Sequence, residues 1–344
     1  MKLEYEILEL RTRHAFHIAR MAAPPARRSV WIRLRDADGV EGWGEAAVST
    51  PYYGETADTV AAVLPQLAAA VREAADGDPL ALERTERAVG RTIGHNSAAK
   101  AGISIALHDL VGKRLGLPLW KLWGLDPIAP PSSFTIGIDE PERMREKVRE
   151  AAAYRILKVK VGTARDREIL EAIRSEAPDA VIRVDANTGW TVKGALAAMP
   201  LLEEMRVEFI EQPLPPTDLE GLRQLRERSP IPIIADESCV SLADIPRLVG
   251  AVDGINIKLA KCGSLREATR MVHTARAHGM LVMLGCMVES TIGVAAAVQL
   301  APLCDYLDLD GAALLENDPF TGPGIEGDGA IRFNTEPGLG VSRG

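Results

Sequence analysis

The sequence predicts an α/β protein in which a (β/α) barrel follows a smaller α+β unit. Short apolar runs recur about every 25 residues between residues 156 and 310, which is the room that a strand, a helix and two loops need. A charged side chain closes most of these runs. In addition, the chain of 344 residues is longer than the roughly 250 residues of a barrel alone, so a second unit is required.

The predicted barrel strands place a set of polar residues at one end of the fold. About seven strands are expected from this period, at Ile156–Lys160, Val181–Val184, Val207–Ile210, Ile231–Ala235, Ile255–Lys258, Val282–Leu284 and Tyr306–Asp310. In such barrels the carboxyl ends of all strands point to one mouth, where the chemistry takes place. The polar residues that end these strands are therefore the candidate functional residues.

The region before the barrel has strands first and helices after. Val30–Arg35 and Val40–Glu45 alternate about an Asp-Gly turn, as in a β-hairpin. Residues 57–75 and 80–115 are rich in Ala and Leu with helical spacing, and a Gly-Leu-Pro stop follows them. We expect an α+β unit here, with a proline- and serine-rich seam at residues 127–133.

Composition excludes several classes of function. The formal net charge of −8 and the lack of a Lys/Arg block argue against nucleic acid as a partner. Acidic residues stand where a signal peptide would be apolar, so we expect a cytoplasmic protein. The four cysteines lack the spacing of a zinc or disulfide framework. Residues 279–303 carry one charge, Glu289, and indicate a buried strand and an Ala-rich helix rather than a membrane span.

Three carboxylates predict one metal site at the barrel mouth. Asp185, Glu211 and Asp236 each close one of three successive apolar runs. Any one of them alone would more often be a strand-end or surface charge. Together, as hard oxygen ligands without histidine or cysteine, they favour magnesium over zinc and also admit manganese.

Two lysines continue the same period on either side of these acids. Lys160 and Lys258 stand across the mouth of an eight-stranded barrel from each other. The metal would stabilise the enediolate that forms from a bound substrate carboxylate, while a lysine accepts the α-proton. One base on each face of that intermediate predicts racemisation or epimerisation. Burial and a nearby cation, such as Lys158 on the same strand face, are expected to lower the pKa of these lysines.

Five motifs in this order resemble the enolase superfamily, and within it the muconate lactonizing enzyme subgroup. They are Lys158-Val159-Lys160, Asp185-Ala186-Asn187, Glu211-Gln212-Pro213, Asp236-Glu237-Ser238 and Asn256-Ile257-Lys258. Enolase-superfamily sites use lysine or histidine bases with magnesium. The resemblance covers almost the whole chain. It implies a (β/α)7β-type modified TIM barrel over residues 123–317, and an α+β capping domain over residues 1–122 that is completed by the tail at 318–344.

Further motifs resemble the dipeptide epimerases of this subgroup. Asp308-Leu309-Asp310 resembles the acid pair by which they hold the substrate's α-ammonium group, and Gly285-Cys286-Met287 also matches them. The resemblance implies proton transfer at the α-carbon of the C-terminal residue of a dipeptide, by Lys160 and Lys258. It also implies substrate contacts from Thr135, Lys158 and Cys286.

A loop from the cap is expected to select the substrate side chain. Arg20 falls where Ala-Glu epimerases of this family carry an arginine that pairs with glutamate, a bidentate contact that suits guanidinium. The implied substrate is L-Ala-D/L-Glu, as in the recycling of murein peptides. Two prolines follow in the loop and could re-aim Arg20, so Arg27 and Arg28 stand as alternatives.

Two other functions stay open at this point. One is a different enzyme of the subgroup, such as an N-acylamino acid racemase, an o-succinylbenzoate synthase or a cycloisomerase, which would not need Asp308 and Asp310. The other is a silent barrel that binds a metal and a small acid without turnover. The resemblance also raises a homo-oligomer as a prediction, and no membrane partner is expected.

Overall fold

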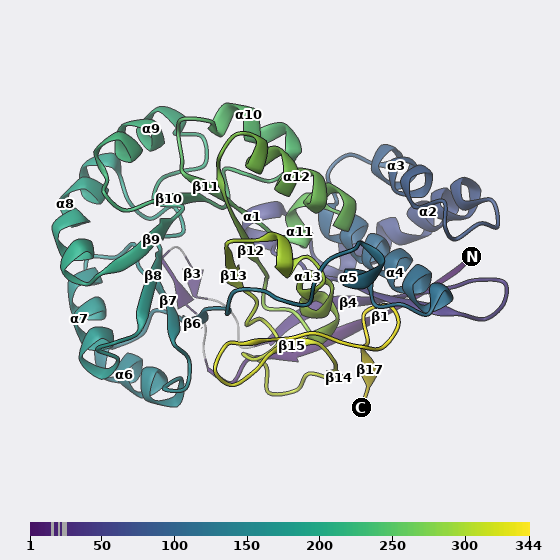
Figure 1. The fold of residues 1–344 in the computed structure, drawn as a ribbon, viewed down its shortest axis with the longest axis horizontal. Helices are drawn as coiled ribbons and strands as arrows, with labels where there is room; N and C mark the ends of the chain where they lie inside the picture. Colours follow the sequence, from purple (N-terminus) through teal and green to yellow (C-terminus); the bar gives the residue numbers. More distant parts are fainter. Residues whose placement is uncertain (15–16, 20, 23–25) are drawn as a thin grey trace.

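The computed structural model describes residues 1–14, 17–19, 21–22 and 26–344, and it places a barrel beside a smaller cap (Figure 1). The barrel sheet has eight parallel strands in consecutive order. They are β6 (Phe134–Ile136), β7 (Ile156–Lys160), β8 (Val181–Asp185), β9 (Val207–Glu211), β10 (Ile233–Ala235), β11 (Gly254–Ile257), β12 (Leu281–Gly285) and β13 (Tyr306–Asp308). A parallel bridge between Ser132 and Leu307 joins the first strand to the last. The predicted (β/α)7β barrel is thereby confirmed.

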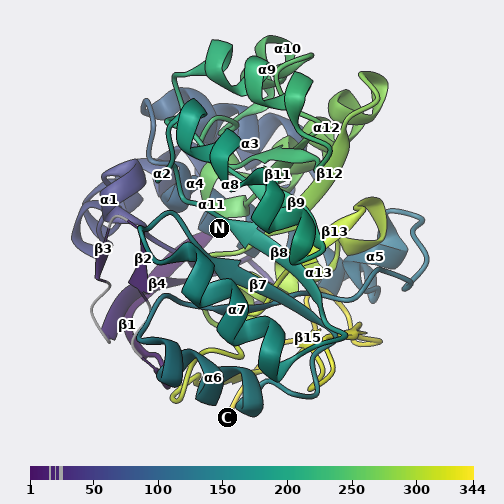
Figure 2. The same ribbon diagram turned by 90° about the vertical axis from the view of Figure 1, so that its left-hand side faces the viewer.

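Helices connect these strands and cover the outside of the barrel (Figure 2). They are α6 (Pro141–Glu150), α7 (Asp166–Glu176), α8 (Val192–Glu204), α9 (Leu219–Arg228), α10 (Ile245–Leu248), α11 (Leu259–Cys262), α12 (Leu265–Ala277) and α13 (Thr291–Val298). Each longer helix turns an apolar stripe inward: α7 buries Ile169, Leu170 and Ile173 against the sheet. This layer and the strands enclose the larger of the apolar cores in the described residues.

The register of the barrel strands sets the level of the polar strand ends. Lys160 on β7 pairs with Asp185 on β8, and Asp185 pairs with Glu211 on β9. Ile234 on β10 then pairs with Glu211, so Asp236 follows two residues later at the same edge. Parallel strands in register therefore bring these four side chains to one end of the barrel.

The cap combines a three-stranded antiparallel sheet with helices. Its strands are β1 (Lys2–Arg11), β4 (Ala26–Arg35) and β5 (Glu41–Ala46), and its helices are α1 (Thr50–Tyr53), α2 (Ala57–Ala75), α3 (Leu82–Thr92), α4 (Ser97–Leu115) and α5 (Leu119–Leu122). The stretch 80–115 is two helices rather than one. The break has a local cause, because His95 and Asn96 adopt the left-handed conformation, with φ of 52° and 54°.

Three further two-stranded sheets are short. The first pairs β2 (His17–Ile18) with β3 (Met21–Ala22). The C-terminal tail pairs β14 (Phe320–Thr321) with β17 (Ser342–Arg343), and β15 (Gly324–Ile325) with β16 (Ile331–Arg332). Phe320 packs edge-on against Trp31, with ring centroids 5.2 Å apart, so the tail contacts the cap sheet. The domain bounds stated above stay a prediction.

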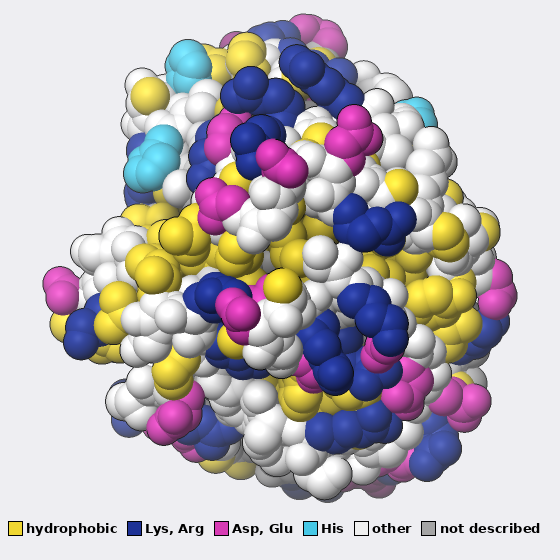
Figure 3. Space-filling model, turned by 90° about the vertical axis from the view of Figure 1, so that its right-hand side faces the viewer, with side chains coloured by type: hydrophobic (Ala, Val, Ile, Leu, Met, Phe, Trp, Pro, Cys, Tyr) yellow, Lys and Arg dark blue, Asp and Glu magenta, His cyan; other side chains and the backbone are white. Residues whose placement is uncertain are grey.

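The cap side of the molecule carries basic side chains in groups beside acidic ones (Figure 3). The cap forms such pairs between Arg33 and Glu4 and between Arg114 and Asp36. The surface there is mixed in sign rather than uniformly basic. Among the described residues no helix combines the length and apolar character of a membrane span.

Candidate active site

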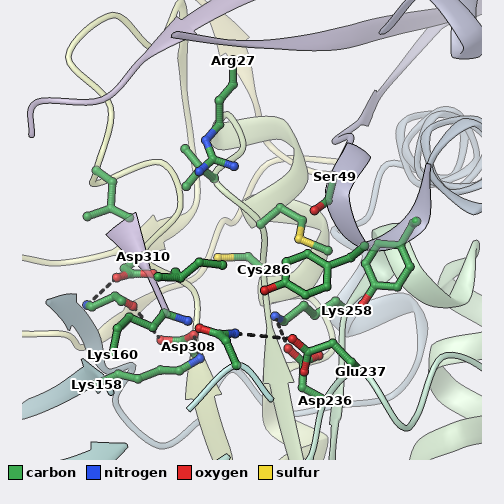
Figure 4. A pocket seen from close by; sticks show the side chains of 18 residues that line it. Arg27, Ser49, Lys158, Lys160, Asp236, Glu237, Lys258, Cys286, Asp308 and Asp310 are labelled. Carbon is green, nitrogen blue, oxygen red and sulfur yellow. Dashed lines mark hydrogen bonds and ion pairs between the residues drawn. The ribbon is translucent and has the colours of Figure 1, made fainter. Parts of the chain in front are cut away.

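A pocket lies at the carboxyl ends of the barrel strands, beneath the cap (Figure 4). The barrel contributes most of its lining, and the cap contributes the rest. The lining residues are Ile18, Arg27, Ser49, Tyr52, Tyr53, Thr135, Lys158, Lys160, Asn187, Asp236, Glu237, Lys258, Cys286, Met287, Val288, Asp308, Asp310 and Leu314. The structure thus brings together most of the residues that the sequence singled out.

The three predicted metal ligands are buried at the floor of this region. Asp185 and Glu211 have no exposed surface, and Asp236 is 2% exposed. Burial together with the charges of Asp185 and Asp236 raises the pKa of Glu211, although Lys158 opposes them. The raised pKa of Glu211 indicates that the three carboxylates lie close enough to repel one another.

Ammonium groups contact all three carboxylates in this structure. Lys160 Nζ lies 2.6 Å from Asp185 Oδ2, and Lys158 Nζ lies 2.6 Å from Glu211 Oε2. Lys258 Nζ lies 2.8 Å from Asp236 Oδ2. As they stand, no three acidic, histidine or cysteine side chains of the described residues form a group that could hold a metal ion.

The donor set nevertheless fits a divalent cation. Three carboxylates without nitrogen or sulfur ligands match the preference of Mg²⁺ for hard oxygens. Their mutual repulsion is what a cation would neutralise. The amide of Asn256 donates to Glu211 Oε1 at 2.7 Å, while Lys158 Nζ lies 2.6 Å from the other carboxylate oxygen. Such a contact orients a ligand.

Lys160 and Lys258 enter the pocket from opposite sides (Figure 4). The expectation of a lowered pKa is wrong for Lys258. Burial would lower the pKa of Lys258, but Asp236 and Glu211 outweigh it and hold that pKa well above its ordinary value. Burial would also lower the pKa of Lys158. The charges of Asp308, Glu211 and Asp185 outweigh burial and raise that pKa.

Lys261 is a functional neighbour that the sequence reasoning missed. Its fully buried ammonium donates to Asp236 Oδ1 at 2.5 Å and to the carbonyls of Asp236, Asn256 and Cys239 at 2.7, 2.8 and 3.0 Å. The signal was a second lysine one turn after Lys258, on α11. Lys261 holds Asp236 in place.

The backbone beside the metal-ligand candidates is strained. Asn187, Thr188 and Gln212 have φ of 42°, 66° and 35°, in the left-handed region that non-glycine residues avoid. Gln212 Oε1 accepts from the backbone N–H of Asp236 at 2.8 Å, which helps to hold this conformation. Such strain is typical of functional sites.

Asp308 and Asp310 lie on the side of the pocket formed by β6, β7 and β13. Asp308 Oδ2 accepts from Lys158 Nζ at 2.8 Å, and Asp310 Oδ2 accepts from the backbone N–H of Thr135 at 2.6 Å. Burial raises and Lys158 lowers the pKa of Asp308, which falls to about 2. Burial and the charge of Asp308 raise the pKa of Asp310 to about 7.

The remaining predicted contacts divide into those inside and outside the pocket. Cys286 lines it, and its Sγ accepts from the backbone N–H of Gly311 at 3.2 Å. Arg27 points from the cap towards the pocket (Figure 4). Arg28 does not line it, because its guanidinium pairs with Asp58 on the surface. Arg20 lies outside the described residues.

Comparison with known proteins agrees with this site. Residues 3–124 match the family model for the mandelate racemase / muconate lactonizing enzyme N-terminal domain, and residues 142–343 match the enolase C-terminal domain-like model. The chain belongs to the enolase superfamily.

Relatives within the superfamily include several dipeptide epimerases. The L-Ala-D/L-Glu epimerase of Bacteroides thetaiotaomicron is 42% identical over 100% of this chain and 88% of its own length. A hydrophobic dipeptide epimerase of Roseobacter litoralis is 38% identical over 99% of this chain and 98% of its own. The dipeptide epimerase of Enterococcus faecalis, solved with Mg and L-Leu-L-Tyr, superposes with a TM-score of 0.91 at 33% identity and covers 99% of both chains.

Proposed function

We propose that the chain is a magnesium-dependent dipeptide epimerase, an isomerase that inverts the α-carbon of the C-terminal residue. The observation that carries this proposal is the pair Lys160 and Lys258, on opposite sides of one pocket that also contains Asp308 and Asp310. Several relatives that span the whole chain are dipeptide epimerases, and one of them was solved with Mg and a dipeptide. The resemblance noted in the sequence supports the same reaction.

Asp185, Glu211 and Asp236 would hold the magnesium ion. When bound there, the ion supplies positive charge next to the substrate carboxylate and so favours loss of the neighbouring α-proton. Lys261 and Asn256 support this role, because they hold Asp236 and Glu211 from outside the pocket. Neither Lys261 nor Asn256 lines the pocket, so these two contacts do not occupy the space where the substrate would bind.

Lys160 and Lys258 carry the proton steps. In one direction, neutral Lys160 removes the α-proton from one face, and protonated Lys258 delivers a proton to the other face. The α-carbon is inverted, and the two lysines end with exchanged protonation states, so the reverse reaction starts from the product. No atoms are gained or lost overall.

Asp308 and Asp310 orient the dipeptide by its α-ammonium group. Both carboxyls are buried at the wall opposite Lys258, and Thr135 and Lys158 hold them. A cation there would reduce the repulsion that raises the pKa of Asp310. An N-acylated substrate has no such cation. The wall therefore supports a dipeptide over the N-acylamino acid, o-succinylbenzoate and cycloisomerase alternatives, and the named relatives support it too.

An acidic C-terminal residue fits the cap side of the pocket. The Arg27 guanidinium faces it there, and such a group binds a carboxylate in two hydrogen bonds. We therefore favour L-Ala-D/L-Glu, with Arg27 and the sequence candidate Arg20 as partners for the glutamate side chain. This substrate would suit recycling of murein peptides. A cytoplasmic location and a homo-oligomer stay predictions from the sequence.

The test is proton exchange in deuterated water. With Mg²⁺ and L-Ala-L-Glu, we expect loss of the glutamate α-proton signal by NMR and growth of the L,D diastereomer. Chelation of Mg²⁺ should stop both, and added Mg²⁺ should restore them. Exchange with L-Ala-L-Leu but not with L-Ala-L-Glu would overturn the acidic preference and keep the reaction. Silence across a dipeptide library would sink the epimerase proposal.

Arg27→Met, with Arg28→Met as the matched control, tests the side-chain contact. The first variant should weaken binding of L-Ala-L-Glu and leave turnover of an apolar dipeptide in place. The second should behave as the wild type, because Arg28 pairs with Asp58 outside the pocket.

A further inference from the structure

One tyrosine of the cap lines the pocket but takes no part in the proposed proton transfer. Tyr52 belongs to α1, the short helix that follows β5, and its side chain lines the pocket with that of Tyr53. The rings of these two residues lie 6.1 Å apart. Neither residue belongs to one of the sequence motifs described above, and none of the proposed reaction steps involves Tyr52.

The hydroxyl oxygen of Tyr52 is buried and has no hydrogen-bond partner among the described residues. Most buried polar groups in proteins are paired, because an unpaired one costs free energy relative to water. The other unpaired buried atoms in this region include Asn187 Oδ1, Glu237 Oε2 and Asn256 Oδ1, which are acceptors. One hydrogen-bond donor and several acceptors in this region are therefore buried without a hydrogen-bond partner among the described residues.

The charges that act on Tyr52 show which end of the pocket it faces. Burial and the charges of Glu237, Asp185 and Asp236 raise its pKa, so the hydroxyl stays neutral and keeps its proton at working pH. Two of these acids are proposed metal ligands, and the third adjoins Asp236. Tyr52 thus lines the pocket with an unpaired hydroxyl and lies near the acids that would hold the metal ion, where a substrate carboxylate would bind.

We propose that the Tyr52 hydroxyl donates a hydrogen bond to the α-carboxylate of the bound dipeptide. This inference rests on the proposed function, and it adds a carboxylate-binding residue from the cap to the site. Substrate binding would then pair a donor that the folded protein leaves unpaired. A residue of the cap would then take part in binding the substrate carboxylate.

The test compares Tyr52→Phe with the wild type, and uses Tyr306→Phe as the control. Tyr306 packs on Phe209 in the barrel, with ring centroids 4.9 Å apart, and does not line the pocket. For L-Ala-L-Glu with Mg²⁺, Tyr52→Phe should raise KM about tenfold or more, since a hydrogen bond to a charged group is lost. The kcat should change less, because the carboxylate is bound in both ground state and transition state. The Tyr306→Phe variant should keep the KM of the wild type.

Thermal unfolding of the substrate-free protein separates binding from packing. The melting temperature of Tyr52→Phe should equal or exceed that of the wild type, because the deleted hydroxyl had no partner. Calorimetric titration with L-Ala-L-Glu and Mg²⁺ should show the same loss of affinity as KM. An unchanged KM and Kd in Tyr52→Phe, or a lowered melting temperature with unchanged affinity, would overturn the inference while the epimerase proposal stands. If the wild type turns over no dipeptide, the epimerase proposal and the Tyr52 inference both fail. The wild-type measurement alone shows this, without any variant.

Discussion

At the residue scale, the site consists of buried charges that neutralise one another. Lys158 contacts Glu211 and Asp308, and Lys258 contacts Asp236, all within 2.8 Å. Single charges at such depth would be costly, whereas paired and hydrogen-bonded ones are tolerated. These ion pairs also hold the lysine and carboxylate side chains at the pocket, where the proposed reaction takes place.

The two proposed bases predict a diagnostic pattern of exchange. Lys160→Ala and Lys258→Ala should each slow epimerisation by a factor of about 100 to 10,000. Each variant should still exchange the α-proton of one diastereomer, because the opposite lysine remains. NMR in deuterated water with L-Ala-L-Glu and L-Ala-D-Glu in separate tubes measures this. Equal exchange of both diastereomers by both variants would contradict the assignment of one lysine to each face.

Asp310 predicts a pH dependence of stability. Its pKa of about 7 in the folded protein lies above the ordinary value of 3.8. The folded state therefore holds this proton more tightly than the unfolded state, so its contribution to stability is present below about pH 4 and lost as pH rises through 7. Glu237, with a raised pKa of about 8, titrates in an overlapping window. Urea unfolding from pH 5 to pH 9 should show a smaller decrease in Asp310→Asn than in the wild type; equal slopes would contradict the assignment.

At the element scale, the cap depends on close packing between a strand and a helix. Gly44 on β5 faces Gly102 on α4 so closely that a Cβ on Gly44 would lie 2.0 Å from the Gly102 carbonyl oxygen. Only the absence of a side chain permits this approach, which brings the sheet and the helix together over the small cap core.

Gly44→Ala should therefore destabilise the protein. Because the added methyl group meets backbone rather than a movable side chain, we expect a loss of about 2 to 3 kcal/mol. Chemical denaturation followed by circular dichroism measures this loss. Gly39→Ala is an informative comparison, because nothing lies within 4 Å of its added Cβ and only its φ of 86° opposes the substitution. A variant at Gly44 as stable as the wild type would contradict the packing argument.

At the scale of the whole molecule, Glu45 joins the cap to the pocket wall. From the end of β5 its carboxylate accepts from Ser29 Oγ at 2.6 Å, Ser290 Oγ at 2.5 Å and the backbone N–H of Gly293 at 3.2 Å. These last two residues lie at the start of α13, which follows the pocket residues Cys286, Met287 and Val288 after Glu289. One cap residue thereby holds the end of a substrate-facing loop.

Glu45→Ala should disturb stability and binding together. Buried donors at the start of α13 lose their acceptor, which should lower the free energy of unfolding by about 2 to 3 kcal/mol. Because the adjoining loop lines the pocket, KM should also rise in the folded fraction. Denaturation and steady-state kinetics measure the two effects. Asp58→Ala, which removes the exposed pair with Arg28, should cost at most about 1 kcal/mol and leave KM unchanged.

Much of this molecule follows from local patterns in the chain. The barrel period, the Asp-Gly hairpin and the helix at 57–75 are repeated local signals, and each appears in the structure with bounds close to those expected. Asp185, Glu211, Asp236, Lys160 and Lys258 could be proposed as one site because strand-end residues of a parallel barrel must meet at its mouth.

Other features depend on which distant segments meet. No pattern in the sequence places the Tyr52 hydroxyl beside acids from barrel strands, joins Glu45 to Ser290, or turns Arg27 towards the pocket and Arg28 away from it. The raised pKa of Lys258 also depends on Asp236 and Glu211, which other strands carry. The sequence determined the elements and the level of their polar ends, because these arise from short-range periodicity. The tertiary structure decided how cap and barrel meet, because packing and electrostatics act between residues that are remote along the chain.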